Sequence, residues 1–407
     1  MAEKIKYDLY SQDYYRRSHA VLARIRQEEP VLHQPGLDGK TPIWFVTTAR
    51  DVDAVLRNDR VFSLDWRKAA DPAIVEQANR TMGVWEMVNQ HLLTLEGEDH
   101  RRLRTLVSKA FTPRMVSEMR PRIQAIADEL IDHLQGAQGE IDLIEHYAFP
   151  LPIAVIAEML GIPYEDRNKF RAWSDSFVTP AITADASALA TSNIMEFVSY
   201  LSALFDQRRA EPRNDLISAL LQAEEQGDSL SVPELFSMVV LLIVAGHETT
   251  VTLLGNATLA LLQHPELAAH LRRHPEEMPE AVEEFLRYDS PVERAITRYV
   301  TEDVELGGKQ LRRGELVIVV LASANRDERH FEQPDQLDLH RANKNHLAFG
   351  RGVHYCLGAP LARMEAEIAL NTMLGRLPNL QLAVPVEELS YRQVPLFHSL
   401  KNLPVKV

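Results

Sequence analysis

The loop Phe349-Gly350-Arg351-Gly352-Val353-His354-Tyr355-Cys356-Leu357-Gly358 contains the only cysteine of the 407-residue chain. Three glycines surround this cysteine, so the backbone can turn sharply and direct N–H groups inward without a clash at Cβ. Pro360 and residues 361–367 then have the composition of a helix start, with proline in the first turn. We therefore expect Cys356 to lie just before a helix N-terminus, where amide dipoles favour negative charge.

Cys356 has the surroundings of a metal ligand. A thiol stays ionised near neutral pH only when hydrogen-bond donors or a metal stabilise the anion. A single thiolate on a glycine-rich turn suits an axial ligand, and the chemistry that most needs one is oxygen activation by haem. The alternatives are a buried inert cysteine and a hydrolytic nucleophile paired with His354. The crowding glycines and the lack of a nearby orienting acid disfavour the nucleophile.

Composition and charge limit the partners of the chain. Its residues are 45% hydrophobic and 25% charged, which is typical of a globular protein able to bury a ligand of haem size. The net charge of −14 argues against nucleic acid as a partner. One cysteine excludes an intrachain disulfide and favours a reducing compartment. Positive charge gathers between His100 and Arg122, which predicts either a basic patch for an acidic protein or a solvated helix face.

The sequence shows neither a targeting signal nor a membrane span. Residues Met1–Tyr10 are polar and lack the apolar core of a signal peptide. The longest apolar run, Met238–Ala245, is far shorter than the roughly 18 residues that cross a bilayer. We therefore expect a soluble cytoplasmic protein that does not bind a membrane.

Helical periodicity dominates the chain. Apolar residues recur at three-to-four spacing in the stretches 14–29, 99–109, 115–135, 151–160, 187–209 and 216–225. Strand patterns are fewer, at 43–48, 304–306 and 316–321. Since no linker, composition shift or internal repeat marks a boundary, we expect residues 1–407 to form a single domain that is mainly α with a minor β portion.

A long buried helix is predicted from Ser231 to Gln263. Ser231 and Glu234 match a capping box, and His264-Pro265 ends the helical pattern. At 1.5 Å per residue this helix is roughly 45 Å long, enough to cross the whole molecule. Apolar side chains surround its middle, so it should be buried on all sides.

Polar residues interrupt the apolar centre of this helix at Ala245-Gly246-His247-Glu248-Thr249-Thr250. A buried acid and two hydroxyls follow a helix-weakening glycine, and a bond from Thr249 back to the carbonyl of Ala245 would open the helix locally. The alternative is a threonine that satisfies itself and a glutamate in a structural pair. A zinc-protease site is excluded, because Val251 stands where the second histidine would be required.

Glu284-Phe285-Leu286-Arg287 forms a third feature, on a helix introduced by Pro279. Glutamate and arginine three residues apart share a helix face. The pair gains significance from its position between the long helix and the cysteine loop.

In this order and spacing, the three features resemble the cytochromes P450 of the soluble bacterial type. The cysteine loop fits the family's haem-binding pattern, Phe-Gly-x-Gly-x-His-x-Cys-x-Gly, at every fixed position. The long helix fits Ala-Gly-x-acid-Thr at residues 245–249, with glutamate where many bacterial relatives have aspartate. Arg341 resembles the arginine that joins the Glu-x-x-Arg pair. The resemblance runs from the first helix to the C-terminus.

The resemblance implies a P450-like fold with haem b between the long central helix and the cysteine loop. Cys356 would be the thiolate ligand of the iron. The further haem-binding residues would be Phe349, Gly350, Gly358 and Ala245, with His100, Arg104, Arg298 and His354 at the propionates.

The resemblance also implies a division between catalytic and structural residues. Glu248 and Thr249 would be catalytic, delivering the protons needed to cleave dioxygen. Glu284, Arg287 and Arg341 would be structural.

The implied reaction is monooxygenation, in which one oxygen atom from O2 enters an apolar small molecule. Electrons from NAD(P)H would come through an external ferredoxin and its reductase, because no reductase segment is fused to the chain. The protein would act as a monomer, and Arg351 and Arg363 would join part of the basic patch in docking the ferredoxin. Alternatives are a peroxide-driven or non-monooxygenase haem-thiolate enzyme and a haem sensor; the acid–threonine pair favours the dioxygen route.

By analogy, the substrate pocket would be lined by apolar residues from several segments, each of which can equally be plain core. These residues are Trp85, Met87, Val88, Leu241, Leu242, Ala245, Val292, Ile296 and Phe397.

Overall fold

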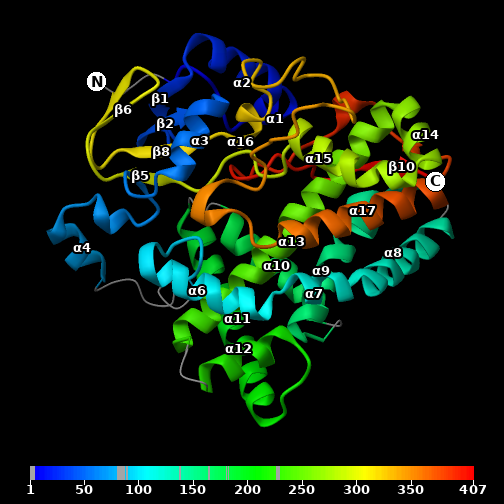
Figure 1. Ribbon diagram of the computed structural model, residues 1–407, viewed down its shortest axis with the longest axis horizontal. Helices are drawn as coiled ribbons and strands as arrows, with labels where there is room; N and C mark the ends of the chain where they lie inside the picture. The colour runs from blue at the N-terminus through cyan, green and yellow to red at the C-terminus, as the bar shows by residue number, and fades with distance from the viewer. Residues whose placement is uncertain are drawn as a thin grey trace. The chain divides into compact units, whose positions relative to one another are not determined.

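The computed structural model describes residues 5–79, 88, 90–136, 139–163, 166–179, 181, 183–225 and 230–407. The chain divides into two compact units. Unit 1 comprises Met1–Ala69, Arg120–Leu151 and Glu248–Val407, and unit 2 comprises Ala70–Met119 and Pro152–His247. Most described residues in regular elements are helical and a smaller share lies in short strands, as the sequence predicts (Figure 1).

Unit 1 contains all of the described strands. Its helices are α1 (Gln12–Arg16), α2 (Ser18–Glu28), α3 (Ala49–Arg57), α8 (Arg120–Gln135), α14 (Pro265–Arg273), α15 (Met278–Tyr288), α16 (Leu321–Ala324) and α17 (Ala359–Arg376). Its strands are β1 (Val31–Pro35), β2 (Pro42–Val46), β3 (Phe62–Ser63), β4 (Glu140–Asp142), β5 (Arg298–Val300), β6 (Val304–Leu306), β7 (Lys309–Leu311), β8 (Leu316–Val319), β9 (Gln381–Leu382) and β10 (Pro404–Lys406).

A five-stranded sheet joins the N-terminal segment to residues near 300–320. Its order is β1-β2-β8-β5-β3, so the blue strands of Figure 1 lie beside the yellow ones. β2 pairs with β8 in parallel, in the register Ile43↔Leu316 to Val46↔Val319, while the other pairs are antiparallel. β5 pairs Arg298 with Val317 on β8. The sheet thereby fixes the backbone of one predicted haem-binding residue.

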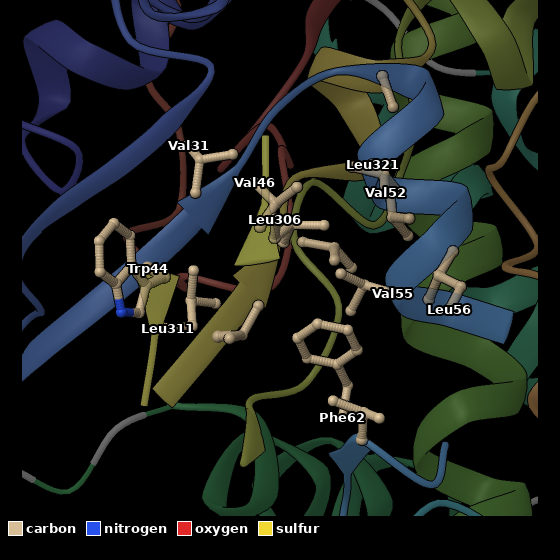
Figure 2. Packing of buried hydrophobic residues seen from close by; sticks show 14 of the residues in the cluster. Val31, Trp44, Val46, Val52, Val55, Leu56, Phe62, Leu306, Leu311 and Leu321 are labelled. Atoms are coloured by element: carbon tan, nitrogen blue, oxygen red, sulfur yellow. The ribbon is translucent and has the colours of Figure 1, made fainter. Parts of the chain in front are cut away.

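Apolar side chains of this sheet and of α3 form one core (Figure 2). Val52, Val55 and Leu56 come from one face of α3 and are almost fully buried. Burying an aliphatic side chain of this size contributes about 1.5–3 kcal/mol relative to leaving it exposed. The core therefore holds α3 against the sheet. The fixed C-terminal end of α3 in turn supports the cysteine loop, which packs on it at Gly352.

Unit 2 is helical in its described part. Its helices are α4 (Pro72–Asn79), α6 (Gly97–Ala110), α7 (Pro113–Glu118), α9 (Pro150–Leu160), α10 (Arg167–Val178), α11 (Ala184–Ala210) and α12 (Leu216–Glu225). Stacked rings of Trp173 on α10 and Phe197 on α11, with centroids 4.8 Å apart, hold these two helices together. A buried ion pair between Arg208 and Asp215, 2.6 Å apart, closes the turn between α11 and α12.

Helix α13 (Val232–Gln263) belongs to both units. Its residues up to His247 are part of unit 2, and its residues from Glu248 onward are part of unit 1. The predicted capping box is present: the amide of Ser231 donates to Glu234 Oε2 at 2.7 Å, and the amide of Glu234 donates to Ser231 Oγ at 3.4 Å. The helix ends at Gln263, as His264-Pro265 predicts. It is continuous α-helix over its whole length, so the sequence identified both ends correctly.

Most predicted helices are present, with two corrections. The stretch 14–29 is two helices, α1 and α2, which break at Arg17, where φ is −122° and ψ 19°. The stretch 115–135 is likewise divided between α7 and α8, at Met119. Helices α11 and α13 are long and apolar enough to span a bilayer, with 33% and 61% of their most apolar windows buried; core helices of soluble proteins meet the same two criteria.

Candidate active site

The cysteine loop is a tight turn followed directly by a helix, as the sequence predicts. The amide of Cys356 donates to the carbonyl of Phe349 at 2.9 Å, and this bond closes the loop. Gly350 and Gly352 have φ of +72° and +71°, which L side chains rarely adopt. Gly358 is the N-cap of α17, with Pro360 in the first turn. Cys356 thus lies two residues before the N-cap of an 18-residue helix, where the amide dipoles favour a thiolate.

Gly352 also fixes the loop against the rest of unit 1. A Cβ added to this residue would stand 2.8 Å from the carbonyl oxygen of Leu56, at the end of α3. No real side chain tolerates such a distance to a backbone atom, so only glycine allows this approach. The core shown in Figure 2 therefore positions the cysteine loop through α3.

The ring of Phe349 packs against one member of an ion pair, Arg363 with Glu283. The guanidinium of Arg363, on α17, lies 4.5 Å from the centroid of this ring. Arg363 donates to both carboxylate oxygens of Glu283 on α15, at 2.6 and 2.9 Å. Burial raises the pKa of Glu283, but the hydrogen bonds and charges of Arg363 and His346 outweigh it and bring the pKa to about 2. The bidentate pair is therefore ionised at neutral pH and ties α15 to α17 beside the loop.

The predicted propionate-binding residues lie in both units. In unit 1, Arg298 is buried on β5 and donates to the carbonyl of Phe62 at 2.9 Å, while His354 is half-buried in the turn of the cysteine loop. In unit 2, His100 is buried and Arg104 half-buried, four residues apart on α6. The two residues of α6 share a helix face, as predicted. The role of these four residues at a propionate stays a prediction.

Glu248 and Thr249 occupy the middle of α13. Glu248 is 3% exposed, and its Oε2 accepts a hydrogen bond from Nη1 of Arg392 at 2.6 Å. Thr249 is half-buried beside it. The carbonyl of Glu248 accepts from the hydroxyl of Thr252 at 2.9 Å, so this helix does contain a side-chain bond of the back-bonding type. The predicted bond from Thr249 to Ala245 stays a prediction.

Arg392 is a residue that sequence reasoning missed. It lies 144 residues from Glu248 in a short C-terminal segment without a motif, so no local pattern reports the contact. Ala245, by contrast, lies on α13 where predicted and is exposed. Its neighbour Gly246 faces Ile156, and an added Cβ would lie 3.0 Å from the end of that side chain.

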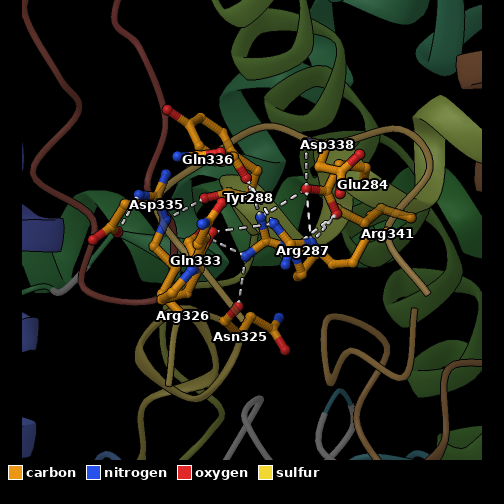
Figure 3. A network of polar contacts seen from close by, with 12 residues as sticks. Glu284, Arg287, Tyr288, Asn325, Arg326, Gln333, Asp335, Gln336, Asp338 and Arg341 are labelled. Carbon is orange, nitrogen blue, oxygen red and sulfur yellow. Dashed lines mark hydrogen bonds and ion pairs between the residues drawn. The ribbon is translucent and has the colours of Figure 1, made fainter. Parts of the chain in front are cut away.

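Glu284, Arg287 and Arg341 form a buried network, as the resemblance implies (Figure 3). Both oxygens of Glu284 accept hydrogen bonds from Arg287 at 2.8 Å and from Arg341 at 3.2–3.3 Å. The guanidinium of Arg287 also donates to three backbone carbonyls, those of Asn325, Pro334 and Gln336. One carboxylate and two arginines therefore fix the long irregular segment that precedes the cysteine loop.

Of the predicted substrate-lining residues, Trp85 and Met87 lie outside the described residues. Val292 and Phe397 form an isolated antiparallel bridge in unit 1, which brings these two predicted residues side by side. Val88 and Phe397 are buried, and Leu241, Leu242, Val292 and Ile296 are half-buried. Whether they contact a substrate stays a prediction.

The donor set of unit 1 fits a haem. A thiol stands on a glycine loop whose backbone admits no side chain at position 352. Haem also brings two carboxylates, which need cationic partners when buried, and the buried guanidinium of Arg298 is of that kind. One thiol together with a buried arginine in the same unit matches iron protoporphyrin better than a bare zinc ion, which needs three or four ligands.

Comparisons with known proteins agree with this chemistry. A family model described as "Cytochrome P450" matches residues 189–381. The chain is 44% identical to cytochrome P450 CYP107DY1 of Priestia megaterium, over 93% of both chains. It is 40% identical to the vitamin D(3) 25-hydroxylase of Pseudonocardia autotrophica, over 98% of this chain and 96% of that one. A crystal structure of the myxobacterial cytochrome P450 CYP267B1 in complex with myristic acid superposes with a TM-score of 0.91, at 41% identity and 98% coverage of both chains.

These relatives match nearly the whole length of the chain, and the cysteine loop and the Glu284 network have the geometry that the sequence resemblance predicted. Haem b is accordingly the cofactor of the protein, and NAD(P)H acts through redox partners. The chain belongs to the cytochrome P450 family, as a haem-thiolate monooxygenase of the bacterial type.

Proposed function

We propose that this enzyme inserts one oxygen atom from O2 into an apolar small molecule, with electrons delivered by a separate ferredoxin and its reductase. The observation that carries the proposal is the buried Glu248 beside Thr249 on α13, in a chain whose only cysteine stands on the haem-binding loop. When bound, the haem supplies the activation of dioxygen. The residues of the chain hold the haem, exclude bulk water and deliver protons.

Within this proposal, Cys356 Sγ binds the iron, and the α17 N-terminus beside it moderates the charge of the sulfur. His100, Arg104, Arg298 and His354 bind the propionates, since each offers an N–H donor or a positive charge. Phe349, Gly350, Gly358 and Ala245 contact the macrocycle, because small or flat groups permit close approach. We also propose that residues 1–407 form one cytochrome P450-like domain.

Glu248 and Thr249 are the proton-delivery residues. A carboxylate can take up a proton and release it again, and a hydroxyl can both donate and accept, so the two in sequence can move a proton stepwise. Arg392, which bonds Glu248 Oε2, is 26% exposed and so extends the polar contacts of the buried carboxylate toward solvent. Without this delivery of protons, the electrons consumed would be released as hydrogen peroxide and not used to form product.

The test is the Thr249→Ala variant, compared with Thr258→Ala on the same helix. Thr258 is buried and donates to the carbonyl of Leu254 at 2.7 Å, so it controls for the loss of a helical threonine hydroxyl. We expect Thr249→Ala to bind haem and consume NAD(P)H but to release most of the electrons as hydrogen peroxide. Thr258→Ala should release no more peroxide than the parent enzyme. Equal peroxide yields from Thr249→Ala and the parent would refute the assignment.

The ferredoxin is proposed to dock on the exposed cations of α6. Several arginines of the predicted patch are neutralised, since Arg114 pairs with Glu118 and Arg120 with Glu367, both at 2.8 Å. Arg363 likewise pairs with Glu283. Arg101 and Lys109 are exposed on α6, and we propose these two cations as the docking residues.

Charge reversal tests this dock. Arg101→Glu with Lys109→Glu should slow reduction by a plant-type ferredoxin, most strongly at low ionic strength, where charges are least screened. The control Arg60→Glu changes an exposed arginine of unit 1 and should leave the rate unaltered. The same reduction rate in the doubly reversed variant and the control would rule out docking on α6.

The substrate is proposed to be an apolar molecule of moderate size. Two relatives support this class, since one is named for vitamin D(3) and another was crystallised with myristic acid. Spin-state titration with myristic acid and vitamin D(3) tests it, and the absence of any shift with either would argue against it. We further propose that the enzyme is a cytoplasmic monomer. Sedimentation of the purified enzyme tests the monomer, and cell fractionation tests the location.

A peroxide-driven or other non-monooxygenase haem-thiolate enzyme is the alternative. The presence of the acid–threonine pair favours the dioxygen route, because the peroxide route requires no relay of protons to dioxygen. Product formed from peroxide faster than from NAD(P)H, ferredoxin and O2 would favour the alternative.

A further inference from the structure

The ion pair between Glu248 and Arg392 joins the middle of α13 to the C-terminal segment of unit 1. Glu248 lies on α13, the longest helix in the described part of the chain, and is 3% exposed, whereas Arg392 is 26% exposed. Their contact at 2.6 Å is the short, charge-assisted type.

The segment that carries Arg392 is a hairpin between residues 390 and 401. The amide of Arg392 donates to the carbonyl of Ser399 at 2.9 Å, and the amide of Lys401 donates to the carbonyl of Ser390 at 2.8 Å. Gln12 clamps the preceding residue, because its side chain donates to the Tyr391 carbonyl at 2.6 Å and accepts from the Tyr391 amide at 3.2 Å. The backbone of Arg392 is thereby fixed, and only its side chain can adjust.

The contact has an electrostatic consequence for Glu248. Removing a carboxylate from water is costly unless a partner compensates its charge. A guanidinium stays protonated at any pH at which the protein is folded, so Arg392 is a permanent compensating charge. Its planar geometry also restricts where the carboxylate can point.

We propose that Arg392 is the positioning residue of Glu248: it holds this carboxylate ionised at rest and oriented, so that the carboxylate can take up a proton from solvent and pass it to Thr249. The inference rests on the proposed function, because it assumes that Glu248 delivers protons. It adds that this delivery depends on a residue of the 390–401 hairpin. That hairpin also carries Phe397, which bridges to Val292, so one rigid element supports both the acid and two predicted substrate-lining residues.

The test uses the haem-loaded full chain and the variants Arg392→Gln, Arg392→Lys, Glu248→Gln and the double variant Arg392→Gln/Glu248→Gln. Arg60→Gln is the matched control, because Arg60 forms an exposed pair with Glu302 at 2.7 Å. Two quantities are measured. One is the infrared C=O stretch of a protonated carboxyl, and the other is the peroxide released per NAD(P)H consumed.

We expect Arg392→Gln to show a new protonated-carboxyl band, because the buried acid loses the positive charge of Arg392. The band should be absent from the double variant, which identifies it as Glu248, and from Arg392→Lys, which keeps the positive charge. Arg392→Gln should raise the peroxide fraction several-fold, and the double variant should release no more peroxide than Glu248→Gln alone. The control should match the parent in both measurements.

The possible failures are distinguishable. If Arg392→Gln shows neither the band nor extra peroxide, the inference is overturned. If it releases extra peroxide and the double variant exceeds Glu248→Gln, Arg392 acts other than through Glu248 and the inference is also wrong. If Glu248→Gln leaves the peroxide yield unchanged, the proton-delivery role of Glu248 fails, and the infrared band alone then decides whether Arg392 holds the carboxylate ionised.

Discussion

Replacing Glu284 by alanine should destabilise unit 1 and release the haem. The carboxylate is 1% exposed and accepts hydrogen bonds from Arg287, Arg341 and the amide of Asp338, the last at 2.9 Å. Its loss leaves two guanidinium groups, which are 1% and 6% exposed, without the buried anion that balances them. Removing one partner of a buried ion pair costs about 3–5 kcal/mol.

This cost can be expressed as a shift in melting temperature. With an unfolding entropy near 2.1 cal/mol/K per residue, a chain of 407 residues loses about 4–6 °C of Tm for 3–5 kcal/mol. Since the network fixes the segment that leads into the cysteine loop, the haem content of the purified variant should fall as well. Thermal denaturation followed by circular dichroism, with the ratio of haem to protein absorbance, measures both effects.

Glu280→Ala is the control on the same helix. Glu280 pairs with Lys344 at 2.8 Å and is 60% exposed, so its loss should change the stability by no more than about 0.5 kcal/mol. If the Glu284→Ala protein is fully loaded with haem and has the same melting temperature as the Glu280→Ala control, the structural role of the network is refuted.

Two further predictions concern the loop and a buried histidine. Gly352→Ala should lower the melting temperature and the haem content more than Gly308→Ala does. Both residues have positive φ, but only at position 352 would the new Cβ lie 2.8 Å from the Leu56 carbonyl oxygen. Equal melting temperatures of the two variants would contradict this. His398 lies 2.8 Å from Asp289, and although burial lowers its pKa, the charge of Asp289 raises it to about 9. Its stabilisation, up to about 3 kcal/mol, is complete below pH 6.5 and is lost as the pH rises through 9. The Tm difference between the parent and His398→Gln should therefore shrink from pH 6 to pH 10, and a constant difference would be contrary to the assignment.

Local patterns in the sequence identified the parts of the site that depend on neighbouring residues. The glycines, Cys356 and Pro360 specify a turn and a helix start within a dozen residues, and α17 begins where they predict. The capping box at Ser231 and the stop at His264-Pro265 likewise define α13. These features are local, because caps and turns are satisfied by atoms a few residues apart.

Contacts between segments that are distant in the sequence could not be predicted from such local patterns. The pairing of β2 with β8 and the ion pair of Arg392 with Glu248 join residues more than 100 positions apart, and nothing local specifies them. Helix α3 was also missed, although Thr48 does cap it by accepting from the amide of Asp51, a signal that the sequence contains. Two arginines of the basic patch, Arg102 and Arg120, likewise pair with carboxylates of distant segments, Glu234 and Glu367. The partner of Arg114, Glu118, lies only four residues away.

The central claim is that the sulfur of Cys356 binds the haem iron. The most direct measurement is the absorption spectrum of the reduced, carbon-monoxide-bound enzyme, compared with that of Cys356→Ser prepared in the same way. The account predicts the red-shifted band of thiolate-ligated haem in the parent and its loss in the variant. A parent enzyme that binds haem without this band, or a Cys356→Ser variant that keeps it, would contradict the account.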